Sequence, residues 1–326
     1  MGPRTQVIVA AIDQGTNTTR LVVGDVEDGR IEELHRESRI TRLGEGVDAR
    51  RKLLPVPIAR VRNVLSDYRR TAEALGAERT LLVATSAVRD AENGEAFLGE
   101  IEWSYGFKTR LLSGHDEAML MFRGVTAERG LRDGTVIVDI GGGSTELVAG
   151  ASDGLRWHDS LDIGSVRITE RFLHSDPPTE AELKDAAAAV RALLSERVPD
   201  EVRNETRSAI GVAGTLTSIA GLALGLEEYD RDQVHGFELS AEALDEQLQR
   251  LASVALAERR KLRPLDPDRA PVIVGGAVIA REVLDFFGLD KLEISERDIL
   301  DGAALAAAEL PEEEEGAAPP GAYTCC

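Results

Sequence analysis

Cysteine is nearly absent from this sequence of 326 residues, which has only Cys325 and Cys326, next to each other at its end. Neighbouring cysteines cannot form the disulfide framework on which small secreted domains depend. The chain is therefore expected to fold without disulfide bonds in a reducing compartment, and we predict a cytoplasmic protein.

Long apolar runs and an excess of positive charge are also missing. No apolar stretch reaches the ~18 residues that a membrane-spanning helix needs, so no membrane association is predicted. The chain has 38 Lys and Arg residues against 58 Asp and Glu residues, a formal net charge of −20. Because proteins that bind duplex nucleic acid usually carry a basic surface, nucleic acid is not expected as a partner. An anionic substrate would need metal cations to help neutralise it.

Two enzyme classes are disfavoured because their motifs do not occur. The sequence has no Gly-x-Ser-x-Gly nucleophile elbow and no Walker-type phosphate loop. Aromatic residues make up only 4% of the chain, so its cores must be built from Val, Leu, Ile and Ala. That composition suits parallel sheets flanked by helices.

A unit of buried strand, aspartate, turn and returning strand occurs twice. In the first copy the apolar run Val7–Ile12 leads to Asp13 and a turn, and in the second Thr135–Val138 leads to Asp139 and a glycine-rich turn. Such a duplication predicts two similar α/β lobes whose turns face a shared cleft.

The domain boundaries follow from this duplication. We predict a first lobe over residues 1–125 and a second lobe over 126–297, with the last helix, in 298–310, returning to the first lobe. Residues 311–326 are rich in Glu, Pro and Gly, which is typical of a disordered acidic tail. Within the second lobe, 241–262 is expected to be helical and Pro271–Val274 to be a strand.

The residues of both turns are suited to binding phosphate. The run Gly141–Gly143 would present successive main-chain N–H groups without side-chain obstruction, and Thr16 and Asn17 offer similar donors in the first copy. An aspartate beside such a cradle, Asp13 or Asp139, is a usual ligand of Mg²⁺ or of its water. Each turn alone is equally an ordinary hairpin with Asp as a turn residue. The presence of two copies favours phosphate binding.

A helix is expected to begin after Ser113, with Asp116 at its capping-box position and Glu117 one turn inside. Glu117 is either part of a solvated acidic first turn, which suits the helix dipole, or a carboxylate that orients and deprotonates an attacking water. Composition alone favours the first interpretation.

Three further charged residues have two interpretations each. Arg89 follows an expected strand end and is either a surface cation or a bidentate clamp for a phosphate, and Arg20 is a similar candidate. Glu146 lies shortly after the glycine turn and is either an outward-facing strand residue or a further carboxylate near a metal.

Six segments occur in a characteristic order: DQGTNTTR (13–20), ATSAVRD (84–90), SGHDEA (113–118), DIGGGSTE (139–146), GVAGT (211–215) and VIVGGA (272–277). Over roughly residues 6–308 the chain thereby resembles the exopolyphosphatase/guanosine pentaphosphate phosphatase (Ppx/GppA) family. Each segment alone is a weak signal, whereas the ordered set is specific.

The resemblance implies an actin-like α/β fold, as in sugar kinases and Hsp70, with two ribonuclease-H-like lobes and a cleft between them. It implies Mg²⁺ (or Mn²⁺) in that cleft, Glu117 as the catalytic base, and Asp139 as the residue that binds metal and positions water. The residues that we expect to bind the substrate are Thr16, Asn17, Arg20, Arg89, Gly141, Gly142, Gly143 and Ser144. Those that we expect near the metal are Asp13, Asp139 and Glu146. Related proteins are commonly dimers, so a homodimer is expected.

The chain departs from the family pattern in three places. Asp116 stands where the family often has Glu, and Thr16 where it often has Ser. Longer members also carry C-terminal helical domains that help grip long polymers, and this sequence stops before them. Short-chain polyphosphate is therefore the expected substrate.

We predict an exopolyphosphatase, a phosphoric anhydride hydrolase that releases terminal orthophosphate from inorganic polyphosphate by metal-assisted attack of water. One alternative is a phosphatase that converts pppGpp to ppGpp at the same site. Another is an ATP-dependent kinase of this fold, which should bind adenosine near Gly275–Gly276. A non-catalytic scaffold of actin type is disfavoured by the acidic residues beside glycine-rich turns.

Overall fold

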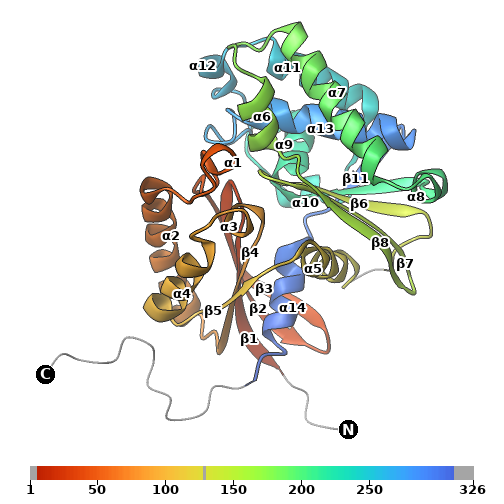
Figure 1. Cartoon of the computed structure of the whole chain (residues 1–326). Helices are drawn as coiled ribbons and strands as arrows, with labels where there is room; N and C mark the ends of the chain where they lie inside the picture. The colour runs from red at the N-terminus through yellow and green to blue at the C-terminus, as the bar shows by residue number, and fades with distance from the viewer. Residues whose placement is uncertain (1–5, 128–129, 312–326) are drawn as a thin grey trace, which may run out of the picture. The chain divides into compact units, whose positions relative to one another are not determined.

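A computed structural model describes residues 6–127 and 130–311, and it divides into two compact units. The first unit consists of residues 1–129 together with 299–326, and the second of residues 130–298 (Figure 1). The acidic tail predicted for 311–326 lies almost wholly outside the described residues. Among the described helices, none is both long enough and apolar enough to cross a membrane.

The first unit is built on a five-stranded sheet in the order β3-β2-β1-β4-β5. The strands are β1 (Val7–Gln14), β2 (Thr18–Glu27), β3 (Arg30–Ile40), β4 (Arg79–Ala84) and β5 (Lys108–Leu111). The first three form an antiparallel meander, and β4 and β5 run parallel to β1. Asp28–Gly29, a dipeptide typical of β-hairpin turns, joins β2 to β3, and both residues have positive φ angles, 51° and 77°.

Helices cover both faces of this sheet. They are α1 (Val47–Arg50), α2 (Pro55–Ala74), α3 (Ser86–Arg89), α4 (Gly94–Tyr105), α5 (Gly114–Thr126) and α14 (Ile299–Ala307). The buried stripe of α2, which includes Val61, Leu65 and Tyr68, packs on one face beside α4. On the other face, α14 packs on β1 and against α5 (Figure 1). At the point of contact, a Cβ on Gly302 would lie 1.9 Å from the carbonyl oxygen of Leu120, so only glycine permits this approach.

The second unit repeats the topology of the first. Its strands are β6 (Thr135–Ile140), β7 (Thr145–Ala151), β8 (Gly154–Leu161), β9 (Ser208–Val212), β10 (Glu238–Ser240) and β11 (Lys291–Ile294), in the order β10-β11-β9-β6-β7-β8. Again three antiparallel strands are followed by two that run parallel to the first. The short β10 is an addition at the edge. The predicted pair of ribonuclease-H-like α/β lobes is therefore confirmed.

The helices of the second unit enclose a core of aliphatic residues. They are α6 (Ser165–Phe172), α7 (Glu180–Arg197), α8 (Asp200–Glu205), α9 (Ala213–Ala223), α10 (Arg231–Val234), α11 (Ala241–Ala252), α12 (Leu256–Arg259) and α13 (Ile273–Phe287). The helix predicted over 241–262 is interrupted between α11 and α12. Helix α13 is buried over most of its length and contacts α7, α11, α6 and α9.

The predicted strand Pro271–Val274 is wrong, because α13 begins at Ile273 and continues through both glycines. A Cβ on Gly275 would lie 2.7 Å from the Thr169 Oγ1, and one on Gly276 would lie 2.4 Å from the Thr215 Cγ2. The glycines therefore let α13 pack closely on α6 and α9. Two short strands of this sheet were not predicted from the sequence: β10, and β11, a four-residue segment after α13.

Candidate functional site

The two predicted phosphate turns have the same main-chain geometry. In the first unit the N–H of Gly15 donates to the Thr18 carbonyl at 3.0 Å, and in the second the N–H of Gly141 donates to the Ser144 carbonyl at 3.0 Å. Each turn joins the first two strands of its sheet. The sequence duplication thus corresponds to two copies of one hairpin.

In the second unit, the start of α6 binds the carbonyls of the glycine turn. The N–H of Ser165 donates to the Gly141 carbonyl at 2.9 Å, and the N–H of Val166 donates to the Gly142 carbonyl at 2.9 Å. A trans peptide points its C=O and its N–H in opposite directions. The following N–H groups, those of Gly142 and Gly143, therefore point away from α6, as a cradle for an anion requires.

The first unit uses a similar arrangement with other partners. The Thr16 carbonyl accepts from the N–H of Gly44 at 2.8 Å, and the Asn17 carbonyl accepts from the N–H of Thr41 at 3.0 Å. The hydroxyls of Thr16 and Ser86 are 2.8 Å apart. The buried Nδ2 of Asn17 finds no hydrogen-bond partner among the described residues, so it is a donor suited to a bound oxyanion.

The equivalent strand positions in the two hairpins carry opposite charges. Asp13 pairs across the strands with Arg20, whose Nε and Nη2 lie 2.9 and 2.7 Å from the Asp13 Oδ2. Asp139 pairs in the same register with Glu146, and both carboxylates are buried. Directly opposed residues have Cβ atoms about 4.5–5.5 Å apart. The second hairpin therefore places two carboxylates close together, where a cation would offset their repulsion.

Asp139 and Glu146 fit a divalent metal that is completed by substrate and water. Among residues 6–127 and 130–311, no group of three or more His, Cys, Asp or Glu side chains could hold a metal ion. Mg²⁺ does not require such a group, because it is usually bound through one or two carboxylates, substrate phosphates and water. The Ser160 hydroxyl donates to the Glu146 Oε1 at 2.9 Å and helps orient that carboxylate. Asp13, the third predicted ligand, is engaged by Arg20 within its own unit.

Glu117 and Arg89 form an ion pair in the first unit. Glu117 lies in the first turn of α5 and is 5% exposed. The Arg89 Nη1 lies 3.1 Å from the Glu117 Oε2 and also donates to the Leu112 carbonyl at 2.9 Å. The structure thus brings together two predicted site residues from α3 and α5. The burial of Glu117 contradicts a solvated first turn, the interpretation that composition favoured.

The predicted capping box at the start of α5 is confirmed. The Ser113 Oγ accepts from the N–H of Asp116 at 3.1 Å, and the Asp116 carboxylate accepts from the N–H of Ser113 at 3.3 Å. The hydrogen bond from the Ser113 hydroxyl lowers the pKa of Asp116. Asp116 therefore fixes the start of the helix, and the next residue, Glu117, is buried against Arg89.

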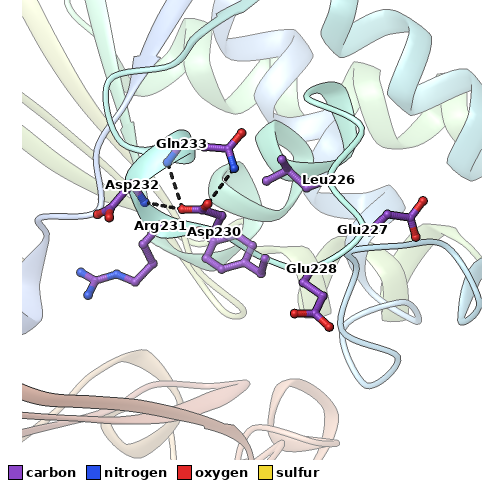
Figure 2. Close-up of a pocket in the computed structure, with 8 residues that line it drawn as sticks. Leu226, Glu227, Glu228, Asp230, Arg231, Asp232 and Gln233 are labelled. Atoms are coloured by element: carbon purple, nitrogen blue, oxygen red, sulfur yellow. Dashed lines mark hydrogen bonds between the residues drawn. The ribbon is translucent and has the colours of Figure 1, made fainter.

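A hollow in the second unit lies beside the start of α10, away from the glycine turn. It is lined by residues 226–233, many of them acidic, and contains none of the predicted site residues (Figure 2). The Asp230 carboxylate accepts from the N–H groups of Asp232 and Gln233 at 3.0 and 3.2 Å, so it caps α10. This hollow is not a candidate active site.

Sequence analysis missed the residues that support the two turns. Gly44 and Gly164 each follow the third strand of a sheet and lie against the turn. A Cβ on Gly164 would be 2.4 Å from the carbonyl carbon of Gly142, and one on Gly44 would be 2.2 Å from the Thr16 Cγ2. The repeated apolar–Gly pair, Leu43–Gly44 and Ile163–Gly164, was the signal that could have revealed them.

Comparisons with known proteins show which family the chain is similar to. The profile of the Ppx/GppA phosphatase family matches residues 22–308. Exopolyphosphatase 2 of Mycobacterium tuberculosis is 41% identical in an alignment of 314 positions, and the match covers 92% of this chain and 98% of that protein. The crystal structure of an exopolyphosphatase-like protein is 35% identical, has a TM-score of 0.87, and covers 93% of this chain and 99% of its own.

A more distant relative has a different activity. The guanosine-5′-triphosphate,3′-diphosphate pyrophosphatase of Aeromonas hydrophila is 24% identical over 288 residues, which are 88% of this chain and 57% of that protein.

Proposed function

This chain belongs to the Ppx/GppA phosphatase family, and from that premise we propose that it is an exopolyphosphatase that releases terminal orthophosphate from inorganic polyphosphate. The observation that carries this proposal is the glycine turn of the second unit. Its carbonyls are bound by α6, its N–H groups point away from that helix, and two buried carboxylates stand beside it. A phosphoryl group with a bound cation satisfies both features.

Each residue has a role suited to its surroundings. The N–H groups of the glycine turn bind phosphoryl oxygens and stabilise the charge that develops on them, and the Asn17 amide of the first unit is a donor of the same kind. The Arg89 guanidinium, held by the Leu112 carbonyl, binds a phosphate oxygen. Glu117 accepts a proton from the attacking water. Because Arg89 is paired with Glu117 without substrate, a bound phosphate that draws Arg89 away would increase the basicity of the carboxylate.

We assign Asp139 and Glu146 as the metal ligands, and Mg²⁺ (or Mn²⁺) as the ion. When bound, the metal neutralises phosphate charge in a protein that is itself strongly acidic. Asp13 would act mainly by holding Arg20, whose guanidinium is then fixed beside the first turn.

A pppGpp phosphatase is the second candidate, because the Aeromonas relative is named as a pyrophosphatase of guanosine-5′-triphosphate,3′-diphosphate. The higher identity to Exopolyphosphatase 2 favours polyphosphate. The kinase alternative loses its basis, because Gly275 and Gly276 are buried by helix packing. Short chains as the preferred substrate, a homodimer and a cytoplasmic location remain predictions.

A substrate panel tests the proposal. Phosphate release is measured from short-chain polyphosphate, long-chain polyphosphate and pppGpp, and from ATP with an acceptor sugar, each with Mg²⁺ and with a chelator. We expect Mg²⁺-dependent release that is fastest from polyphosphate and needs no acceptor. Preference for pppGpp would select the second candidate, and transfer only to an acceptor would reject hydrolysis.

A further inference from the structure

Arg167 is a buried charged residue next to the glycine turn. It is the third residue of α6 and is only 8% exposed. Its Nε donates to the carbonyl oxygen of Gly143 at 2.8 Å, a hydrogen bond that is itself buried. Burying a guanidinium is costly unless hydrogen bonds compensate the loss of water, so its position calls for an explanation.

The explanation lies in how α6 meets the turn. The first residues of the helix bind the carbonyls of Gly141 and Gly142 through their main-chain N–H groups. The next carbonyl, that of Gly143, accepts instead from the Arg167 side chain. Three successive carbonyls are thus directed toward α6, and the close approach this needs is possible because residue 164 is glycine.

The side chain has a consequence for the other side of the loop. The peptide that joins Gly143 to Ser144 is trans, so fixing its C=O toward Arg167 fixes the Ser144 N–H in the opposite direction. The N–H groups of residues 142, 143 and 144 then face the same way, and a fixed positive charge lies near them. Donors held in place in this manner bind an oxyanion without reorganising.

We propose that Arg167 is a positioning residue of the phosphate loop, which orients the Gly143–Ser144 peptide toward a bound phosphoryl group. This inference rests on the proposed function only in that the loop binds phosphate. Arg167 acts through the loop and does not itself touch the reacting atoms.

Arg259 provides a matched control. It is 4% exposed and lies in the same unit, and its guanidinium also donates to main-chain carbonyls, those of Leu251 at 2.8 Å and Val254 at 2.9 Å. The carbonyls that it binds, which include that of Ala270, lie outside the phosphate loop. R259A therefore measures the general cost of removing a buried arginine that binds carbonyls.

The test compares R167A and R259A by calorimetric binding of inorganic phosphate with Mg²⁺, by kcat/KM on polyphosphate, and by thermal unfolding. We expect R167A to weaken phosphate binding and to lower kcat/KM, each by about tenfold to a hundredfold. A few millimolar guanidinium should restore part of both. R259A should lose stability similarly but keep phosphate affinity within about twofold of wild type. R167K keeps the charge but not the planar guanidinium, so its phosphate affinity and kcat/KM should lie between those of wild type and R167A. It replaces R167A in the test if R167A does not fold.

Unchanged phosphate affinity in R167A or R167K, or an equal loss in R259A, would overturn the inference. If the wild-type protein binds phosphate but releases none from polyphosphate, the proposed function fails, and the binding comparison still decides the role of Arg167. If the wild type does not bind phosphate at all, the inference about Arg167 fails, and the substrate panel still decides the proposed function.

Discussion

The carboxylate of Glu117 is buried beside a guanidinium, and its neighbour Asp116 is used to cap the same helix. Two adjacent acidic residues thus have different surroundings and different roles. The sequence allowed Glu117 to be either a solvated residue of the first helical turn or a catalytic carboxylate, and it did not decide between the two. Glu117 is buried beside Arg89, which is 28 positions away in the sequence, so no local pattern could have predicted its burial.

We expect Glu117→Gln to lower kcat by about 10²-fold or more, because the amide cannot accept the proton of the attacking water. Inhibition by inorganic phosphate should remain close to that of wild type. D116N is the control, since it weakens the capping box and should reduce thermal stability with little effect on kcat. An unaltered kcat in E117Q would remove Glu117 from the mechanism.

The role that we propose for Arg167 could not be predicted from the sequence. The glycine turn was visible in the sequence, whereas the side chain that supports it enters from a helix beyond β8. A residue that acts across such a distance gives no signal in the turn itself. The turn residues were predictable because their chemistry is local.

Among the elements, those with strong local signals were predicted and the others were not. The predicted α5 capping box was confirmed, and the Asp28–Gly29 turn between β2 and β3 also has a clear local signal. The run Pro271–Val274 resembles a buried strand, and α13 is so enclosed that its apolar residues show no single face. A short apolar run before glycines does not distinguish a buried strand from a buried helix.

The capping box of α7 should make stability depend on pH. The pKa of Glu182 falls to about 2, first because its carboxylate accepts from the N–H of Thr179. An ordinary Glu titrates near 4.3, so the folded state has the lower pKa and this stabilisation is present above about pH 4.3 and lost as pH falls toward 2. Melting temperatures of wild type and E182Q should differ at neutral pH and converge toward pH 2.

E242Q is the control for that comparison. Glu242 lies in the first turn of α11, where the cap is Ser240 and position N3 is Ala243, so no capping box forms. A difference between wild type and E182Q that does not change with pH would show that the carboxylate charge is not the cause.

The close contact between α14 and α5 predicts that a substitution of Gly302 destabilises the protein. In Gly302→Ala, the new Cβ would meet the Leu120 main chain, which cannot move without displacing α5. We expect a loss of more than about 2 kcal/mol in the free energy of unfolding, measured with denaturant. Because α5 carries Glu117, kcat should fall as well.

Gly99 in α4 offers the opposite case, since a Cβ there meets nothing within 4 Å. G99A should stabilise the protein by about 0.4–1 kcal/mol, because alanine has less freedom to lose on folding. Equal stability changes in the two variants would contradict the packing argument.

For the molecule as a whole, the duplicated topology was predictable and its details were not. Two copies of the strand–turn–strand unit predicted two similar sheets, and both have the same strand order. The edge strand β10 has only three residues and β11 only four, so neither has enough alternation to be recognised.

The overall charge is a reason to expect that turnover needs the proposed metal ion. A chain of net charge −20 and a polyanionic substrate repel each other unless cations intervene. We expect a chelator to abolish turnover and Mg²⁺ to restore it.

In Asp139→Asn the Mg²⁺ concentration for half-maximal activity should rise at least about tenfold, because one of two paired carboxylates is lost. D159N is the control, as Asp159 lies on β8 and pairs with Arg197. Wild-type Mg²⁺ dependence in D139N would reject the assignment.

The contrast between Arg20 and Glu146 has a consequence for how the two halves specialised. In one copy of the hairpin the acid has an arginine as its counter-charge within the same pair of strands. In the other copy the acid faces a second acid, so a divalent cation would reduce the repulsion between the two carboxylates. We therefore expect the hairpin of the second unit to respond to the supply of divalent ions more strongly than that of the first.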